Sequence, residues 1–161
     1  MPGTFTVHLP IKSYLKKYLI KKYGTSYKIS SNSLLGIFLI EILDKQYRKE
    51  HRQIKEKNYY PIIIPKVIVE KVGFDFPTSK MRRFELMIKQ LFRNELDSHV
   101  DIAINAELYV NINDKKYKLD VMKAIKQYLE FYDITEDELR LDSLYRDYKR
   151  IKNEIGHKKV S

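Results

Sequence analysis

The chain has 161 residues, of which 43% are hydrophobic and 32% charged, and that length suits one domain with its own hydrophobic core. It contains no cysteine, which excludes disulfides, thiolate catalysis and cysteine-ligated zinc. The formal net charge is +10, from 31 Lys and Arg against 21 Asp and Glu, so the composition favours an acidic partner.

The positive charge is concentrated at the start of the chain. Residues 1–60 hold 12 basic and 4 acidic side chains, whereas residues 61–110 hold 7 of each. A basic end is typical of proteins that bind phosphate backbones. The alternative is compositional, because 23 lysines against 8 arginines, with many Tyr, Ile and Asn, is also what an AT-rich genome encodes.

Membrane insertion is not expected. A span needs roughly 18 consecutive apolar residues, and the densest apolar run, Leu34–Leu43, is interrupted by Gly36 and Glu41. The first ten residues lack the charged start and apolar stretch of a signal peptide. We therefore expect a cytoplasmic protein without a membrane partner.

The first quarter of the chain predicts a strand and two helices. Alternating polarity predicts a strand over Thr4–His8, and Pro10 suits the first position of an amphipathic helix over Ile11–Tyr23. Residues 30–33 offer N-caps for a second helix from Leu34 to about Glu50. Its first half is apolar on nearly all sides, which predicts a place in the core or against a partner chain; its charged continuation, to residue 57, should project into solvent.

Residues 59–74 are rich in β-branched side chains. Pro61 and Pro65 should confine the first part to a sheet edge or an extended arm, while Val67–Val72 makes a better strand. This region could pair with Thr4–His8.

A long helix is expected next. Pro77 and Thr78 open it, and helical spacing extends it over Ser79–Ala106, with a buried side formed by Phe84, Met87, Ile88, Leu91, Leu96 and Val100. An alternative breaks the helix near Asp97 and makes Ala106–Ile112 a strand. A polar turn is expected over Asn111–Lys116.

The end of the chain predicts three helices. The first covers Leu119–Phe131, a short one begins at Thr135, and the last runs from Asp142 or Ser143 to about Ile155. Thr135 and Glu138 form a capping box, which marks a helix start. Three helices with a short middle one have the spacing of a helix-turn-helix unit.

We therefore expect an α+β, predominantly α-helical fold in a single domain, residues 1–161. Within it, residues 1–76 would form a basic N-terminal α/β part. Residues 77–161 would form a helical part that ends in a helix-turn-helix-like unit, residues 117–155.

The candidate DNA-binding residues form two sets. One side of the last helix carries side chains of types that contact phosphates and purine edges: Arg146, Lys149, Arg150 and Asn153. The first helix carries lysines that could hold phosphates, interleaved with tyrosines that could stack on bases: Lys12, Lys16, Lys17, Lys21 and Lys22, with Tyr14, Tyr18 and Tyr23.

Each set has a structural alternative. The last helix could simply present a solvated face; its turn lacks the usual glycine, and a nearby acidic cluster would repel DNA if it faced the same way (Asp133, Glu136, Asp137 and Glu138). In the first helix, the tyrosines could be core residues and the lysines could serve solubility.

Signals for catalysis, metals and cofactors are sparse. Five glycines leave little room for a phosphate-binding loop. His99 follows Glu95 and neighbours Asp97 and Asp101, but such spacing is more typical of surface ion pairs than of metal ligands. The pair Asp97 and Asp101 could hold Mg²⁺ for a nuclease, although ordinary helix charges look the same. We expect no enzyme, no metal and no cofactor.

Two segments carry a family resemblance: FTVHLPIKSYLKKYLIKKYG, residues 5–24, and YDITEDELRLDSLYRDYKR, residues 132–150. They resemble a group of small uncharacterised proteins from phages and mobile elements of Bacteroidetes. The resemblance extends over most of the chain and implies a mobile-element setting, where small basic helical proteins often handle DNA.

The leading hypothesis is a non-enzymatic DNA-binding protein of a phage or mobile element, acting in regulation or replication. The alternative is a protein-protein interaction or assembly factor that binds no nucleic acid. That alternative rests on the apolar run Leu34–Leu43 and the proline-containing arm, either of which could contact a second copy in a homo-oligomer.

Overall fold

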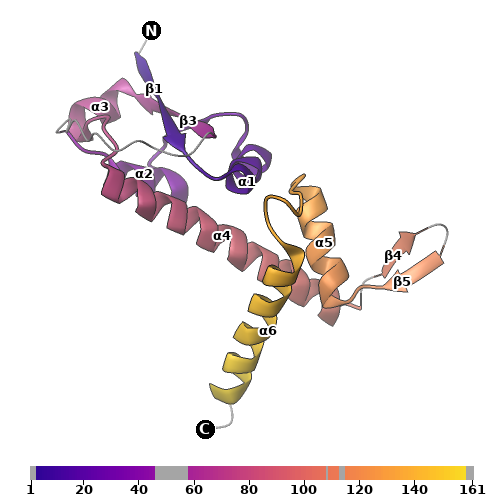
Figure 1. Ribbon diagram of the computed structural model, residues 1–161. Coiled ribbons are helices and arrows are strands. Elements are labelled where there is room, and N and C mark those ends of the chain that lie inside the picture. Colours follow the sequence, from indigo (N-terminus) through magenta and orange to yellow (C-terminus); the bar gives the residue numbers. More distant parts are fainter. Residues whose placement is uncertain (1–2, 46–57, 108, 113–114, 159–161) are drawn as a thin grey trace. The chain divides into compact units, whose positions relative to one another are not determined.

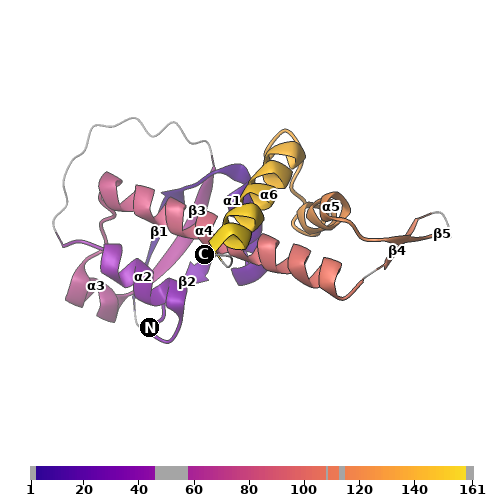
Figure 2. The same ribbon diagram turned by 90° about the horizontal axis from the view of Figure 1, so that it is seen from below.

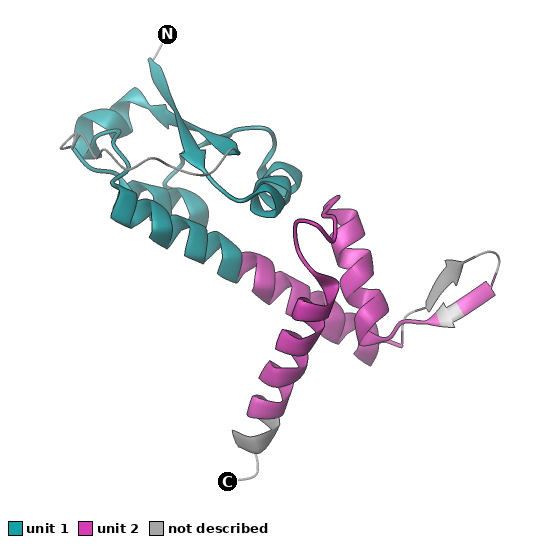
Figure 3. Ribbon diagram, in the orientation of Figure 1, with its two compact units in different colours: residues 1–90 teal, residues 91–161 magenta. Residues whose placement is uncertain are grey.

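The computed structural model describes residues 3–45, 58–107, 109–112 and 115–158 (Figure 1). Within these ranges six helices and five strands form an α+β fold that is mostly helical, which confirms the predicted class. The chain divides into two compact units, residues 1–90 and 91–161 (Figure 3). No helix in the described ranges is long and apolar enough to cross a membrane.

A three-stranded sheet organises the first unit. Strand β1 (Thr4–Pro10) pairs antiparallel with β3 (Tyr59–Pro65), and the short β2 (Tyr27–Lys28) pairs parallel with β3 on its other side. The predicted first strand and its pairing with the region after residue 59 are confirmed. Pro10, expected to open a helix, is instead the last residue of β1, opposite Tyr59.

The prediction that Pro61 and Pro65 confine their segment to an edge or arm is wrong, because β3 is the central strand. The Ile11 N–H donates to the Asn58 carbonyl, and the Lys66 N–H donates to the Gly3 carbonyl. Antiparallel partners alternate between bonded and non-bonded pairs, so even-numbered β3 residues bond β1 and both prolines occupy non-bonded positions. On the other side, β2 pairs only with residues 62 and 63.

The strand expected over Val67–Val72 is also wrong, because this segment is helix α3 (Lys66–Val72). Pro65 precedes the helix, and the Gly73 N–H closes it by donating to the Val69 carbonyl at 2.8 Å. None of its residues is buried. The β preference of valine and isoleucine depends on packing against neighbouring strands, which this segment does not have in the described structure.

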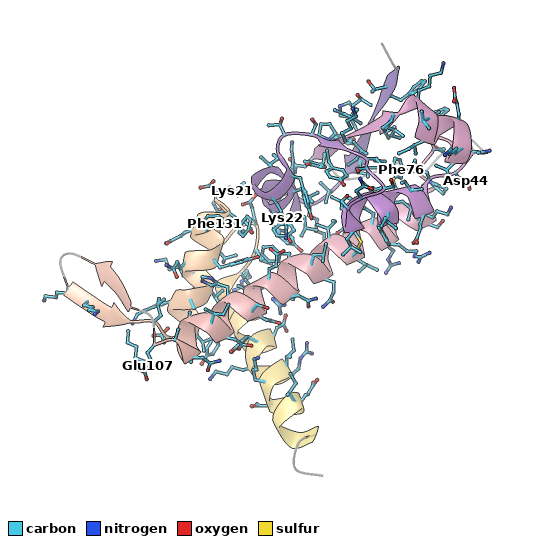
Figure 4. All side chains as sticks on the ribbon, turned by 180° about the vertical axis from the view of Figure 1, so that it is seen from behind. Lys21, Lys22, Asp44, Phe76, Glu107 and Phe131 are labelled. Atoms are coloured by element: carbon cyan, nitrogen blue, oxygen red, sulfur yellow. The ribbon has the colours of Figure 1, made fainter. Side chains whose placement is uncertain are left out.

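Helix α1 (Ser13–Tyr23) confirms the first predicted helix, and its C-cap is Gly24, whose φ is 90°. Helix α2 (Leu34–Ile42) confirms the second but ends about eight residues early. Leu43 leaves it with extended backbone, and Asp44 then forms an isolated β-bridge with Asp75. Figure 4 marks Asp44 and Phe76 in this part of the first unit. The charged continuation predicted over 46–57 lies outside the described residues.

Apolar side chains from the sheet and helices form the core of the first unit. Fully burying a Leu, Ile or Phe side chain contributes about 1.5–3 kcal/mol. Residues at most 2% exposed are Leu9, Ile11, Leu15, Tyr18, Leu19, Ile29, Leu35, Leu39, Ile42, Tyr60, Ile62, Ile64, Phe84 and Ile88. Burial raises the pKa of Tyr60 to about 12, with a contribution from Tyr23 and Tyr27, and its hydroxyl donates to the Gly24 carbonyl at 3.0 Å.

Helix α4 (Thr78–Asn105) confirms the long predicted helix. It is unbroken at Asp97, so the alternative with a break there is wrong, although a strand does follow residue 106. Phe84, Ile88, Leu96 and Val100 are buried as predicted, whereas the half-buried Met87 and Leu91 are not core residues. The residue missed on this side is Phe92, which is 1% exposed.

A β-hairpin stands where a polar turn was expected over Asn111–Lys116. Strand β4 (Tyr109–Ile112) pairs antiparallel with β5 (Lys115–Lys118). Two views show the hairpin extending away from the helices of the second unit (Figures 1 and 2).

Helix α5 (Val121–Phe131) is confirmed and begins at Asp120, whose carboxylate accepts from the Lys123 N–H at 2.9 Å. It ends in a Schellman motif, because the Asp133 N–H donates to Glu130 and the Ile134 N–H to Leu129. Asp133 takes the left-handed conformation, φ 55°, that the missing glycine would have supplied.

The short middle helix predicted after Thr135 is wrong, because residues 136–138 form a turn. The Thr135 N–H does donate to the Glu138 carboxylate, at 3.0 Å. The Glu138 N–H, however, bonds the Thr135 backbone carbonyl, at 3.1 Å, not its side chain. Residues 117–155 therefore contain two helices joined by a turn, the second being α6 (Leu141–Lys158).

Candidate nucleic-acid interface

Helix α6 separates an anchored side from an exposed basic side. The apolar spacing of this helix predicts an inward side that includes Leu144, Tyr148 and Ile155; the first two are buried, whereas Ile155 is 46% exposed. The four predicted DNA-binding residues of this helix are all exposed: Arg146, Lys149, Arg150 and Asn153. We call these four residues the α6 basic face. Their spacing of three and four residues places them in one row.

Polar bonds to α4 fix which side of α6 is exposed. Arg93 of α4 forms an ion pair with Asp147. The Tyr148 hydroxyl donates to Asp101 at 2.6 Å, and Lys152 pairs with the other oxygen of the same carboxylate. These bonds hold one side of α6 against α4, so the α6 basic face points away from α4.

Two carboxylates of α4 respond oppositely to this arrangement. Burial raises the pKa of Asp97, an effect that the nearby Arg93 and Lys152 charges only partly offset. Burial would also raise the pKa of Asp101, but hydrogen bonds from Lys152 and Tyr148 outweigh it and the pKa is lowered. The Oδ1 atom of Asp97 is buried and has no hydrogen-bond partner among the described residues.

The suggestion that Asp97 and Asp101 hold Mg²⁺ gains no support from their surroundings. Asp101 already contacts a lysine and a tyrosine. Across the described ranges, no group of three or more His, Asp or Glu is arranged to hold a metal ion.

The N-terminal lysines lie on α1 or, for Lys12, at its N-cap, in the first unit, whereas the α6 basic face belongs to the second unit. Lys12 pairs with Glu85 at 3.6 Å, and Lys16 and Lys17 are half-buried. Lys21 and Lys22 are exposed in the last turn (Figure 4). Partial burial lowers the pKa of Lys22, whose Nζ donates to the Tyr18 hydroxyl at 3.3 Å.

The tyrosines of α1 do not all fit the proposed base-stacking role. Tyr14 and Tyr18 are buried in the core of the first unit, so stacking on nucleic acid is wrong for these two. Tyr23 is half-buried and packs edge-to-face on Tyr27, with ring centroids 5.4 Å apart.

Sequence reasoning missed a basic patch on the hairpin. Lys115, Lys116 and Lys118 are exposed on β5, and Lys118 pairs with Glu107 at 2.9 Å. The signal was the run KKYK after Asn113-Asp114, but without a partner strand it looks like a polar turn.

A second missed feature is a pocket of about 290 Å³ in the second unit, lined by His99, Gln127, Tyr128, Phe131 and Tyr132. We call it the aromatic pocket. Its sequence signal was the spacing of Tyr128, Phe131 and Tyr132 by three and four residues, which places aromatic rings on one side of α5.

No protein-family model, no curated protein and no solved structure matches this chain.

Proposed function

We propose that this chain is a non-enzymatic DNA-binding protein that contacts DNA through the α6 basic face. The observation that carries the proposal is the exposure of Arg146, Lys149 and Arg150 in one row while the opposite side of α6 is held on α4. The row from Arg146 to Asn153 spans roughly 10 Å at 1.5 Å per residue. A B-DNA major groove, about 12 Å wide, admits a helix of this kind.

The contacts of the α6 basic face leave its cations available to phosphates. Arg150 pairs with Asp147 at 3.5 Å, and the arginine side chain is 68% exposed. Exposed pairs of this kind contribute at most about 1 kcal/mol. Lys149 lies over the Tyr145 ring at 5.6 Å from its centroid, a contact that does not neutralise its charge.

Other basic surfaces would hold the DNA backbone. The α1 residues Lys12, Lys16, Lys17, Lys21 and Lys22 and the hairpin lysines supply positive charge on two further elements. The proposed setting is cytoplasmic, in regulation or replication of a phage or mobile element, in keeping with the resemblance of residues 5–24 and 132–150.

The test is the triple substitution Arg146→Gln, Lys149→Gln and Arg150→Gln. Each lost phosphate contact should reduce the slope of log affinity against log salt by about 0.9, so the triple variant should lose up to about 2.7 of slope on duplex DNA. Fluorescence anisotropy on a labelled duplex at several salt concentrations measures both quantities.

A matched control removes the same charges elsewhere. Lys71, Arg82 and Arg83 are exposed on α3 and α4, and their triple glutamine variant should keep most of the affinity and slope. Equal losses in both variants would mean that only net charge matters, and an unchanged test variant would remove the α6 basic face from the binding surface.

An assembly role is the second candidate, because α2 exposes apolar side chains. Leu34 is 71% exposed and Ile37 is 46% exposed, one helical turn apart. A stable oligomer that fails to bind DNA at low salt, and that the double variant Leu34→Ser, Ile37→Ser turns into monomers, would favour this candidate. Light scattering gives the solution mass.

A further inference from the structure

The aromatic pocket has a buried aromatic floor and an exposed rim. Tyr128 and Tyr132 are buried, and their ring centroids are 4.9 Å apart. At the rim, Gln127 is exposed and Phe131 is 59% exposed. Figure 4 shows Phe131 at the end of α5 away from Glu107.

Neighbouring rings pack against the floor of the aromatic pocket. Tyr128 packs edge-to-face on Phe92 at 5.5 Å, and its hydroxyl donates to the Phe92 carbonyl at 3.4 Å. Tyr132 packs edge-to-face on Phe131, with centroids 4.9 Å apart. Aromatic walls of this kind favour flat π-systems, because stacked and edge-to-face pairs gain energy beyond simple burial.

Two polar side chains give the aromatic pocket a hydrogen-bonding edge. His99 lies 5.5 Å from Tyr128 between ring centroids, and its Nε2 is buried with no hydrogen-bond partner among the described residues. Gln127 offers an amide with both donor and acceptor groups. A ligand with a purely hydrocarbon ring would leave the buried His99 Nε2 unpaired, so the lining favours a heteroaromatic ring with a polar edge.

The volume of the aromatic pocket suits a small ligand. At about 290 Å³, the aromatic pocket lies at the lower end of the roughly 300–1,000 Å³ range of small-molecule sites. A purine base fits within this space.

We propose that the aromatic pocket binds an unpaired nucleobase, with adenine preferred. A glutamine amide matches the donor and acceptor pair at N6 and N7 of adenine, and the rings supply the stacking that sequence-tolerant base binding uses. The inference rests on the proposed function for its nucleic-acid partner. The same chemistry would also accept the base of a free nucleoside.

The experiment titrates three probes into the full chain: adenosine, a single-stranded oligonucleotide of deoxyadenosines, and the same oligonucleotide with abasic positions. NMR signals of the His99 ring report occupancy, and anisotropy gives the oligonucleotide affinity. The variants are Phe131→Ala and Gln127→Leu. The control is Phe74→Ala, which removes a ring of similar exposure, 46%, that stacks on Phe5 in the first unit.

Loss of one base stack should weaken binding by about 5- to 140-fold, from the 1–3 kcal/mol measured per stacked base. Adenosine binding that shifts the His99 signals and weakens at least fivefold in Phe131→Ala supports a nucleoside site. Oligonucleotide binding alone that weakens in Phe131→Ala and with abasic positions supports a base within a strand. The control should match the parent chain in either case.

Unchanged oligonucleotide affinity in both pocket variants, together with no response of His99 to adenosine, would overturn the inference. Duplex binding through the α6 basic face is tested separately by its own triple variant. Retained duplex affinity with an unresponsive pocket would therefore reject the nucleobase site while leaving the proposed function standing.

Discussion

Gly36 in the first turn of α2 offers a sharp test, because two physical effects predict opposite signs. A Cβ atom at this position would lie 1.8 Å from the Ser30 carbonyl oxygen and 2.8 Å from Ser33 Oγ. Ser33 is the N-cap of α2 and accepts from the Gly36 N–H at 3.1 Å. The substitution Gly36→Ala therefore forces the backbone at Ser30 to move away from the capped end.

The expected magnitude follows from three contributions. Alanine gains about 1 kcal/mol over glycine in a helix interior. Overpacking costs about 1–3 kcal/mol, and loss of a serine N-cap costs about 0.5–2 kcal/mol. The net change is a destabilisation of about 0.5–4 kcal/mol, so the steric cost exceeds the helix preference.

Urea denaturation followed by circular dichroism at 222 nm measures the free energy of unfolding. The matched control is Gly3→Ala, where the added Cβ would lie 3.8 Å from Lys66 Cδ, an ordinary van der Waals contact. The control should stay within about 0.5 kcal/mol of the parent chain. A Gly36→Ala variant at least as stable as the parent chain would refute the close approach of α2 to Ser30.

Three further substitutions test the second unit. Burial raises the pKa of Asp97, so this carboxyl stabilises the folded state when protonated, below pH 3.8, and the stabilisation is lost as pH rises through the raised pKa. Asp97→Asn should therefore raise the free energy of unfolding at pH 7, and raise it less at pH 3. Urea titrations at both pH values measure the difference. Asp133→Gly relieves a left-handed residue, φ 55°, and should raise the unfolding free energy by about 1 kcal/mol; a loss of stability would contradict the Schellman geometry. Tyr148→Phe removes the hydrogen bond to Asp101 and should lower the free energy of unfolding by about 1–2 kcal/mol at pH 7. The loss should be smaller in acid, because the pKa of Asp101 is lowered and the stabilisation from its carboxylate disappears as pH falls through that pKa. Equal losses at neutral and acid pH would exclude this bond as the cause.

Helical periodicity carried most of the correct sequence predictions. The apolar spacing along α4 identified Phe84, Ile88 and Val100 as core residues and kept the helix continuous. The same spacing on α6 separated the buried Tyr148 from the exposed Arg146, because an amphipathic helix packs only one side against the rest of its unit.

The errors arose where the outcome depends on distant partners. Pro61 fits a central strand because it falls at a non-hydrogen-bonded position opposite β1. That register depends on β1, which lies about 50 residues away, so the local sequence does not reveal it. The valines after Pro65 lie in helix α3, and no strand in the described part of the chain pairs with them. The aromatic pocket needed His99 of α4 beside Tyr128 of α5, a pairing 29 positions apart that no local pattern encodes.

The two prolines of β3 also act on folding fidelity. A one-residue slip against β1 would turn the odd-numbered positions of β3 towards the ladder, so Pro61 and Pro65 would face carbonyls without a donor to offer. The same slip would move Tyr60, Ile62 and Ile64 off the core face. The misaligned pair of strands would thus lose hydrogen bonds and apolar burial together. The two prolines therefore favour a single register of β3 against β1.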